Sequence, residues 1–147
     1  MNTCNPKGRD NPWSTFYFSV TGYIKTYDLY LYSDDNSNYS CEDNFYGELV
    51  SKQFNEQLTK LLKEEIYEEI KVESTFSTVQ NEKYDENYDI QNILNGSDKL
   101  QNTTNIYVVS NKNKAENTAN KIEETIKDNH IYGSFYIEVL NTLIMVI

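Results

Sequence analysis

The chain has 147 residues, of which 38% are hydrophobic and 14% aromatic, which excludes a disordered polypeptide and suits a single folded domain. Its formal net charge of -10 disfavours direct binding of nucleic acid, because such binding needs a basic surface that displaces counterions. Five glycines and two prolines also exclude a collagen-like or low-complexity chain.

The terminal segments and the two cysteines predict the cellular compartment of the protein. We expect residues 1–12, which are mostly polar, to form a flexible tail before one domain over residues 13–147. No apolar stretch follows the start, and the longest apolar run, Leu143–Ile147, is far shorter than the ~20 residues that span a membrane. Cys4 and Cys41 form no multi-bridge framework, so we expect reduced thiols in a cytoplasmic protein without membrane contact. Abundant Asn, Lys, Tyr and Ile indicate an AT-rich genome.

Hydrophobic periodicity predicts two strands and a long helix in the first part of the chain. Alternation of apolar and polar residues over 14–23 and 27–32 predicts two strands that pair as a hairpin. The stretch 33–40 is rich in Asp, Asn and Ser, which favours a loop. From Asp43, a candidate N-cap, apolar residues recur with a helical period, so we expect a helix that ends near Glu65.

A third strand and a long connection follow this helix. Alternation returns from Ile70 to Ser77 and predicts a strand. Residues 80–105 contain few apolar side chains and predict a long connection, broken by one short helix over residues 90–94 that stops at Gly96.

The last part of the chain predicts a strand, a helix and a strand. Residues 106–110 form a short apolar run, and residues 112–129 carry alanines and isoleucines at helical spacing. The final strand starts at Gly133 and becomes apolar on both faces over Leu143–Ile147, which is typical of the centre of a covered sheet.

The element order is therefore ββαβ, a long connection, then βαβ. It predicts an α+β fold with a mostly antiparallel sheet of about five strands and two main helices packed on one face. Without its first strand the order contains βαβ twice, which is the split βαβ pattern of a ferredoxin-like sandwich.

The residue inventory argues against several kinds of catalytic and metal site. His130 is the single histidine, and it follows the second long helix, where an imidazole is favourable for structural reasons. No glycine-rich phosphate loop is present. Asp34, Asp35, Glu42 and Asp43 lie close together in sequence, but without the spacing of an EF-hand they favour a solvated loop over a cation site. We expect no catalytic residue, no metal and no cofactor.

Most of the net charge lies in one segment. Residues 64–89 contribute -7, from nine acidic and two basic residues, with tyrosines interleaved. Like charges four residues apart near the end of a helix are unfavourable, so local folding does not require them. Carboxylates combined with tyrosines suit a basic partner, although an acidic run can also be a solvated surface that maintains solubility. The candidate partner-binding residues are Glu64, Glu65, Tyr67, Glu68, Glu69, Glu73, Tyr84, Asp85, Glu86 and Tyr88.

These features predict a small acidic protein that inhibits a basic partner protein, such as a nucleic-acid-binding protein or a toxin, by occupying its basic surface. Immunity proteins and phage anti-defence proteins act in this way, and no enzymatic activity is expected. The alternative is a small-ligand binder or divalent-metal-dependent enzyme that uses carboxylates and tyrosines, with residues 80–105 as a lid. A third interpretation is a structural subunit that associates through an exposed sheet edge, its oligomeric state being open.

Overall fold

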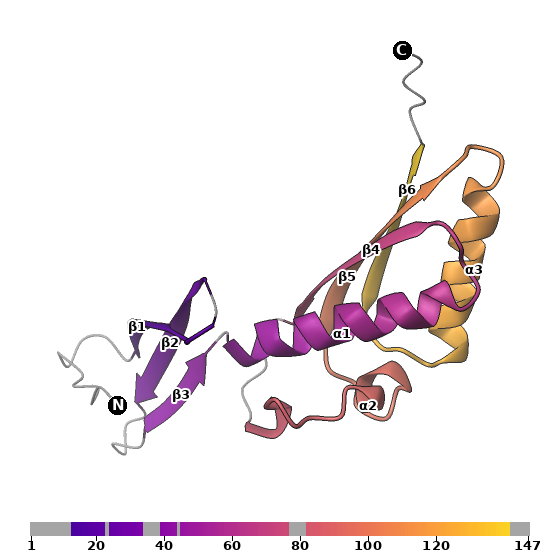
Figure 1. Cartoon of the computed structure of the whole chain (residues 1–147). Coiled ribbons are helices and arrows are strands. Elements are labelled where there is room, and N and C mark those ends of the chain that lie inside the picture. The colour runs from indigo at the N-terminus through magenta and orange to yellow at the C-terminus, as the bar shows by residue number, and fades with distance from the viewer. Residues whose placement is uncertain (1–12, 23, 34–38, 44, 77–81, 142–147) are drawn as a thin grey trace, which may run out of the picture.

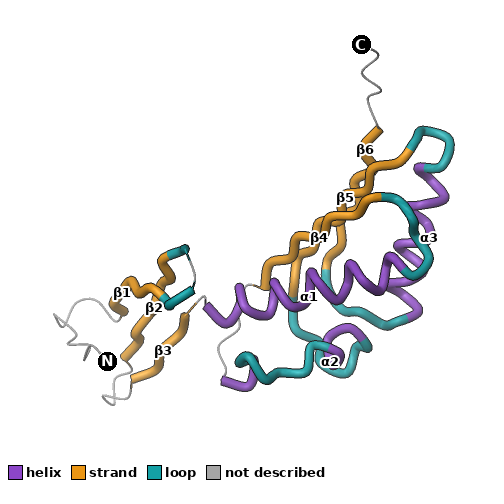
Figure 2. Tube along the Cα trace, in the orientation of Figure 1, coloured by secondary structure: helices purple, strands orange, loops and turns teal. Residues whose placement is uncertain are grey.

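The computed structural model describes residues 13–22, 24–33, 39–43, 45–76 and 82–141. In this part of the chain, strands and helices form an α+β fold with two separate sheets. Figure 1 shows the sheets apart from each other, with the first long helix running from one sheet across the other. Figure 2 separates the strands, helices and connecting loops along the same trace.

The first sheet is an antiparallel meander of β1 (Trp13–Ser19), β2 (Thr26–Ser33) and β3 (Tyr39–Asp43). The predicted hairpin is confirmed, since β1 and β2 pair along their whole length. The predicted loop over 33–40 is wrong at Ser33, Tyr39 and Ser40, which are paired in β2 and β3, and its residues 34–38 lie outside the described residues. The predicted N-cap at Asp43 is wrong, because Asp43 pairs with β2. This third strand shows little apolar alternation, and backbone hydrogen bonds to the edge of β2 hold it in place.

The second sheet consists of β4 (Glu69–Phe76), β5 (Asn102–Ser110) and β6 (Ser134–Asn141), in that order. β4 runs antiparallel to β5, whereas β6 runs parallel to it, and α3 (Ala115–Asp128) connects β5 to β6. The predicted single sheet of about five strands is therefore wrong. The ferredoxin-like arrangement fails with it, because the N-terminal strands form a sheet of their own.

β5, and not the final strand, is the centre of the second sheet. The prediction that the final strand lies in the middle rested on Leu143–Ile147, which lies outside the described residues. β5 also begins at Asn102, several residues before the predicted apolar run, because polar Thr103 and Thr104 are paired on both sides.

The core lies between the long helices and one face of the second sheet. In α1 (Phe45–Lys63) four apolar side chains recur every fourth residue and are buried. They meet alternate residues of β4 and β5 and the apolar stripe of α3. Phe54 packs edge to face on Phe76, with ring centroids 5.3 Å apart. The central core residues are Val50, Phe54, Leu58, Leu62, Ile70, Val72, Phe76, Ile106, Val108, Ile122 and Ile126.

The connection between β4 and β5 packs on the core. It contains a 3₁₀ turn, η1 (Glu82–Tyr84), and α2 (Gln91–Leu94), which confirms the predicted short helix. Gly96 stops α2 as predicted, with φ of +74°. A Cβ there would lie 2.4 Å from the carbonyl oxygen of His130, so the close approach of these two turns requires glycine.

Candidate functional site

Residues 64–69, called here the acidic turn, connect α1 to β4. The backbone N–H groups of Glu65 and Ile66 donate to the carbonyl oxygen of Leu62 at 3.3 and 3.0 Å. The side chain of Ile66 is 2% exposed and belongs to the core. The backbone of the acidic turn is therefore fixed to the end of α1 by hydrogen bonds and by a buried side chain.

Most side chains of the acidic turn are directed to solvent. Glu64, Glu65 and Glu69 are exposed, and Tyr67 is 94% exposed. Glu68 differs, because it is partly buried and accepts a hydrogen bond from the Thr118 hydroxyl at 3.2 Å. Three glutamates and one tyrosine are thus available to a partner, while Glu68 attaches the turn to α3.

Glu73 lies on the same face of β4 as Glu69, and it is also exposed. Its carboxylate is 2.6 Å from the ammonium of Lys71, the residue between them on that face. The hydrogen bond and charge of Glu73 raise the pKa of Lys71. Lys71 therefore partly neutralises the sheet face that follows the acidic turn.

The tyrosines of the connection face an internal carboxylate. We call Lys83, Tyr84, Tyr88 and Asp98 the Asp98 cluster. Both tyrosine hydroxyls donate a hydrogen bond to Asp98 Oδ2, at 3.1 Å for Tyr84 and at 2.8 Å for Tyr88. Lys83 Nζ lies 2.6 Å from the same oxygen and 4.9 Å from the centroid of the Tyr84 ring. The two rings lie 4.9 Å apart. One carboxylate therefore joins η1 to the segment that precedes β5.

These contacts shift the titration of every member of the cluster. Burial raises the pKa of Asp98, but the hydrogen bonds from Lys83, Tyr88 and Tyr84 outweigh it and bring the pKa below its usual value. Burial and the Asp98 carboxylate raise the pKa of both tyrosines, so their hydroxyls remain donors. The hydrogen bond to Asp98 raises the pKa of Lys83.

The structure separates the predicted binding residues into three places: the acidic turn, the middle of β4 and the connection. Tyr84 is 8% exposed and Tyr88 is partly buried, with both hydroxyls on Asp98. Asp85 accepts a hydrogen bond from the backbone N–H of Asn87 at 2.8 Å, and Glu86 is exposed. Candidate residues that are close together in the sequence therefore do not all belong to one surface.

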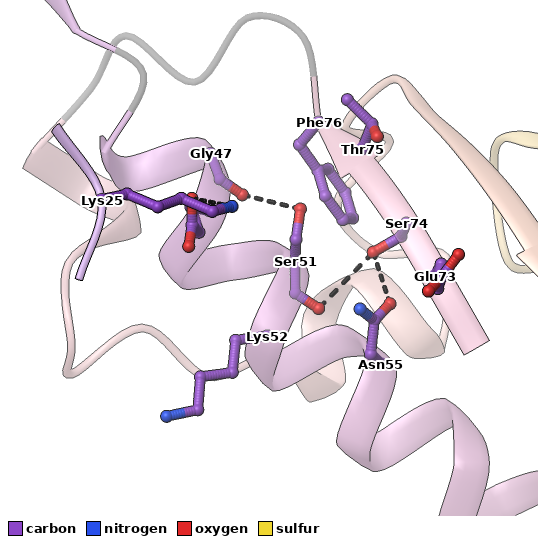
Figure 3. Close-up of a pocket in the computed structure, with 10 residues that line it drawn as sticks. Lys25, Gly47, Ser51, Lys52, Asn55, Glu73, Ser74, Thr75 and Phe76 are labelled. Atoms are coloured by element: carbon purple, nitrogen blue, oxygen red, sulfur yellow. Dashed lines mark hydrogen bonds and ion pairs between the residues drawn. The ribbon is translucent and has the colours of Figure 1, made fainter. Parts of the chain in front are cut away.

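A hollow of about 540 Å³ lies between α1, the end of β4 and the turn before β2 (Figure 3). Inside it Ser74 Oγ donates to Asn55 Oδ1 at 2.6 Å, and Lys25 pairs with Glu48 at 3.0 Å. Figure 3 shows Lys25 and Glu73 on opposite sides of the hollow. The lining combines cations, carboxylates, hydroxyls and an amide from Lys25, Gly47, Glu48, Ser51, Lys52, Asn55, Glu73, Ser74, Thr75 and Phe76.

No group of three or more His, Cys, Asp or Glu side chains is placed to hold a metal ion within the described ranges. Of the acidic residues weighed as cation ligands, Asp34 and Asp35 lie outside those ranges, and Glu42 and Asp43 belong to β3. No described helix has the length and apolar character that crossing a bilayer requires.

Comparisons with known proteins give no family. No protein-family model matches the chain, and no curated protein matches it. One solved structure, described as "structural genomics", has 9% sequence identity to it and a TM-score of 0.31, over 88% of this chain and 99% of the other. At that score the likeness supports no conclusion about fold or function.

Proposed function

We propose that this protein binds a basic surface of a partner protein through the acidic turn and thereby inhibits the partner in the cytoplasm. The observation that carries the proposal is the combination of exposed charge and fixed backbone. Glu64, Glu65 and Glu69 are exposed beside Tyr67, which is 94% exposed, on a turn that Ile66 anchors in the core.

A preorganised turn is suited to binding, because little backbone entropy is lost when the partner docks. The glutamates attract a basic partner over a Debye length and accelerate encounter at low salt. Tyr67 supplies contact area with two rotatable bonds, as aromatic anchors do at the centre of interfaces. The charge thus accelerates and orients the encounter with the partner, and the tyrosine supplies affinity for it.

The type of partner follows from this charge. A basic groove that normally receives phosphates offers many cations, and a protein that fills it blocks its ligand. Nucleic-acid-binding proteins and nuclease toxins have such grooves, so an immunity or anti-defence role fits the acidic turn. In this proposal Tyr84, Tyr88 and Glu68 support the fold, while Glu73 on β4 and Glu86 in the connection are not part of the contact.

The experiment compares two charge-matched variants of the immobilised full chain. The first replaces Glu64, Glu65 and Glu69 by glutamine. The control replaces three exposed glutamates elsewhere by glutamine, namely Glu56, Glu116 and Glu124. Proteins from a lysate of the source cell are captured at several salt concentrations and identified by mass spectrometry.

A basic protein that binds the wild type and the control, but is lost with the first variant and at high salt, would support the proposal. Its activity should fall when the wild-type chain is added. Capture that is the same for both variants, or that survives high salt, would contradict a role for the acidic turn.

The hollow favours a second candidate, a binder of a small polar ligand. It gathers hydroxyl, amide and carboxylate groups beside the buried ring of Phe76, and no tyrosine is among the described residues that line it. A thermal-shift scan with Mg²⁺, Ca²⁺, Mn²⁺ and a metabolite panel tests this function. A stabilising ligand whose effect disappears in Asn55→Ala would favour this alternative, and the absence of any shift would reject it.

A further inference from the structure

The outer edge of β6 is open among the residues that the structure describes, since β6 pairs there with β5 alone. It is eight residues long, contains neither proline nor glycine and has one charged residue, Glu138. The opposite edge strand, β4, carries Glu69, Lys71 and Glu73. Charged side chains on an edge oppose pairing with another chain, so β6 is the less protected of the two edges.

Apolar surface remains uncovered on both faces of β6. On the helix side Phe135, Ile137 and Val139 are partly exposed, whereas Ile106 and Val108 of the central strand are 0% exposed. On the open side Tyr136 is 61% exposed and Leu140 is 42% exposed. A further strand along this edge would cover part of both faces.

We propose that the edge of β6 binds the same edge of a second copy of this chain, in antiparallel orientation. The two three-stranded sheets then form one continuous sheet. A two-fold axis perpendicular to the sheet keeps the helices of both copies on one side, and it places one residue of β6 opposite its own counterpart.

The sequence of β6 favours some antiparallel registers over others. With Ile137 opposite its counterpart, Phe135 faces Val139 of the second copy and Tyr136 faces Glu138 of the second copy. This register pairs apolar residues on one face and a tyrosine hydroxyl with a carboxylate on the other. With Glu138 at the centre, two carboxylates would be opposed, which is unfavourable. The strand is thus complementary to itself in the register centred on Ile137, and not in the one centred on Glu138.

Sedimentation equilibrium of the full chain tests the proposal through charge changes at exposed positions. In Tyr136→Glu a glutamate faces Glu138 of the second copy twice in the dimer, and we expect the dimer dissociation constant to rise about tenfold. Tyr136→Lys should dimerise at least as well as the wild type. Combining Tyr136→Glu with Glu138→Lys should restore the dimer, because opposite charges again face each other.

Tyr132→Glu is the matched control, since it adds the same charge at a side chain that is 45% exposed and outside β6. It should leave the dissociation constant unchanged, and circular dichroism should show every variant folded. A wild type that is monomeric up to millimolar concentration would overturn the proposal. A dimer that Tyr136→Glu does not weaken would overturn it as well.

Discussion

Replacing Asp98 by asparagine tests whether one carboxylate holds the connection between β4 and β5 in place. The change keeps the shape of the side chain and removes the charge that accepts bonds from Tyr84, Tyr88 and Lys83. A hydrogen bond to a charged group contributes about 1.5–3 kcal/mol, against about 1 kcal/mol for a neutral one. The Lys83 side chain is 51% exposed, so solvent screens its ion pair with Asp98 and the pair adds little to stability.

The two tyrosine bonds therefore dominate the expected loss. We expect Asp98→Asn to lower the free energy of unfolding by about 1–2 kcal/mol at pH 7, and to lower Tm by about 3–6 °C for a chain of this length. Urea unfolding followed by circular dichroism measures the loss. Glu86→Gln, a change of the same charge at an exposed position in the same connection, should leave the free energy of unfolding within about 0.5 kcal/mol of the wild type.

The pH dependence of this loss of stability identifies the charge of Asp98 as its cause. The pKa of Asp98 is lower in the folded protein than in the unfolded chain, so its stabilisation is present above the unfolded pKa of about 3.9. It is lost as the pH falls through the folded pKa. The difference between wild type and Asp98→Asn should stay constant from pH 7 to about 5 and shrink below pH 4. A variant as stable as the wild type at pH 7, or a difference independent of pH, would refute this reasoning.

Three further changes test the core, a tight turn and the proposed binding surface. Phe54→Ala removes a fully buried ring that packs on Phe76, and it should lower the free energy of unfolding by about 3–5 kcal/mol in urea titrations, where a loss below about 1 kcal/mol would contradict the packing. In Gly133→Ala the new Cβ would lie 2.5 Å from Asn102 Oδ1 at φ of +148°, so we expect a loss of about 2 kcal/mol or more, and an unchanged urea midpoint would show that this turn is not tight. Tyr67→Ala should change the free energy of unfolding by less than about 0.5 kcal/mol yet weaken capture of a basic partner, and equal capture would exclude Tyr67 as the anchor.

Periodicity predicted the elements that have a clear apolar stripe. The helix of Ala115–Asp128 and the strand of Glu69–Phe76 lie within a few residues of their predicted positions, because burial on one side produces the spacing that was used to find them. The strand of Tyr39–Asp43 escaped prediction, since its pairing with β2 depends on the backbone and leaves no mark on the side chains. The arrangement of the strands into two sheets was missed for the same reason.

The candidate site was predicted from local charge density, which locates charge along the chain but not the direction of each side chain. The glutamates of the acidic turn are indeed exposed, apart from Glu68. Tyr84 and Tyr88 face Asp98, a residue that lies beyond the acidic segment and was therefore not among the candidate residues. A tyrosine is the same letter in the sequence whether its side chain faces solvent or a carboxylate. Only the fold distinguishes the two cases.

The meander of β1, β2 and β3 has a consequence for how the molecule opens. Each of its strands pairs with its neighbour in the chain, and Tyr27 and Lys25 contact the start of α1 through Phe45 and Glu48. A unit of local contacts with a small junction opens at a lower free energy than the main core. Amide protons of β2 should thus exchange through a partial opening that leaves those of β5 protected. A cellular protease would therefore cleave this protein first in its N-terminal sheet, while the acidic turn at the far end of α1 is still folded.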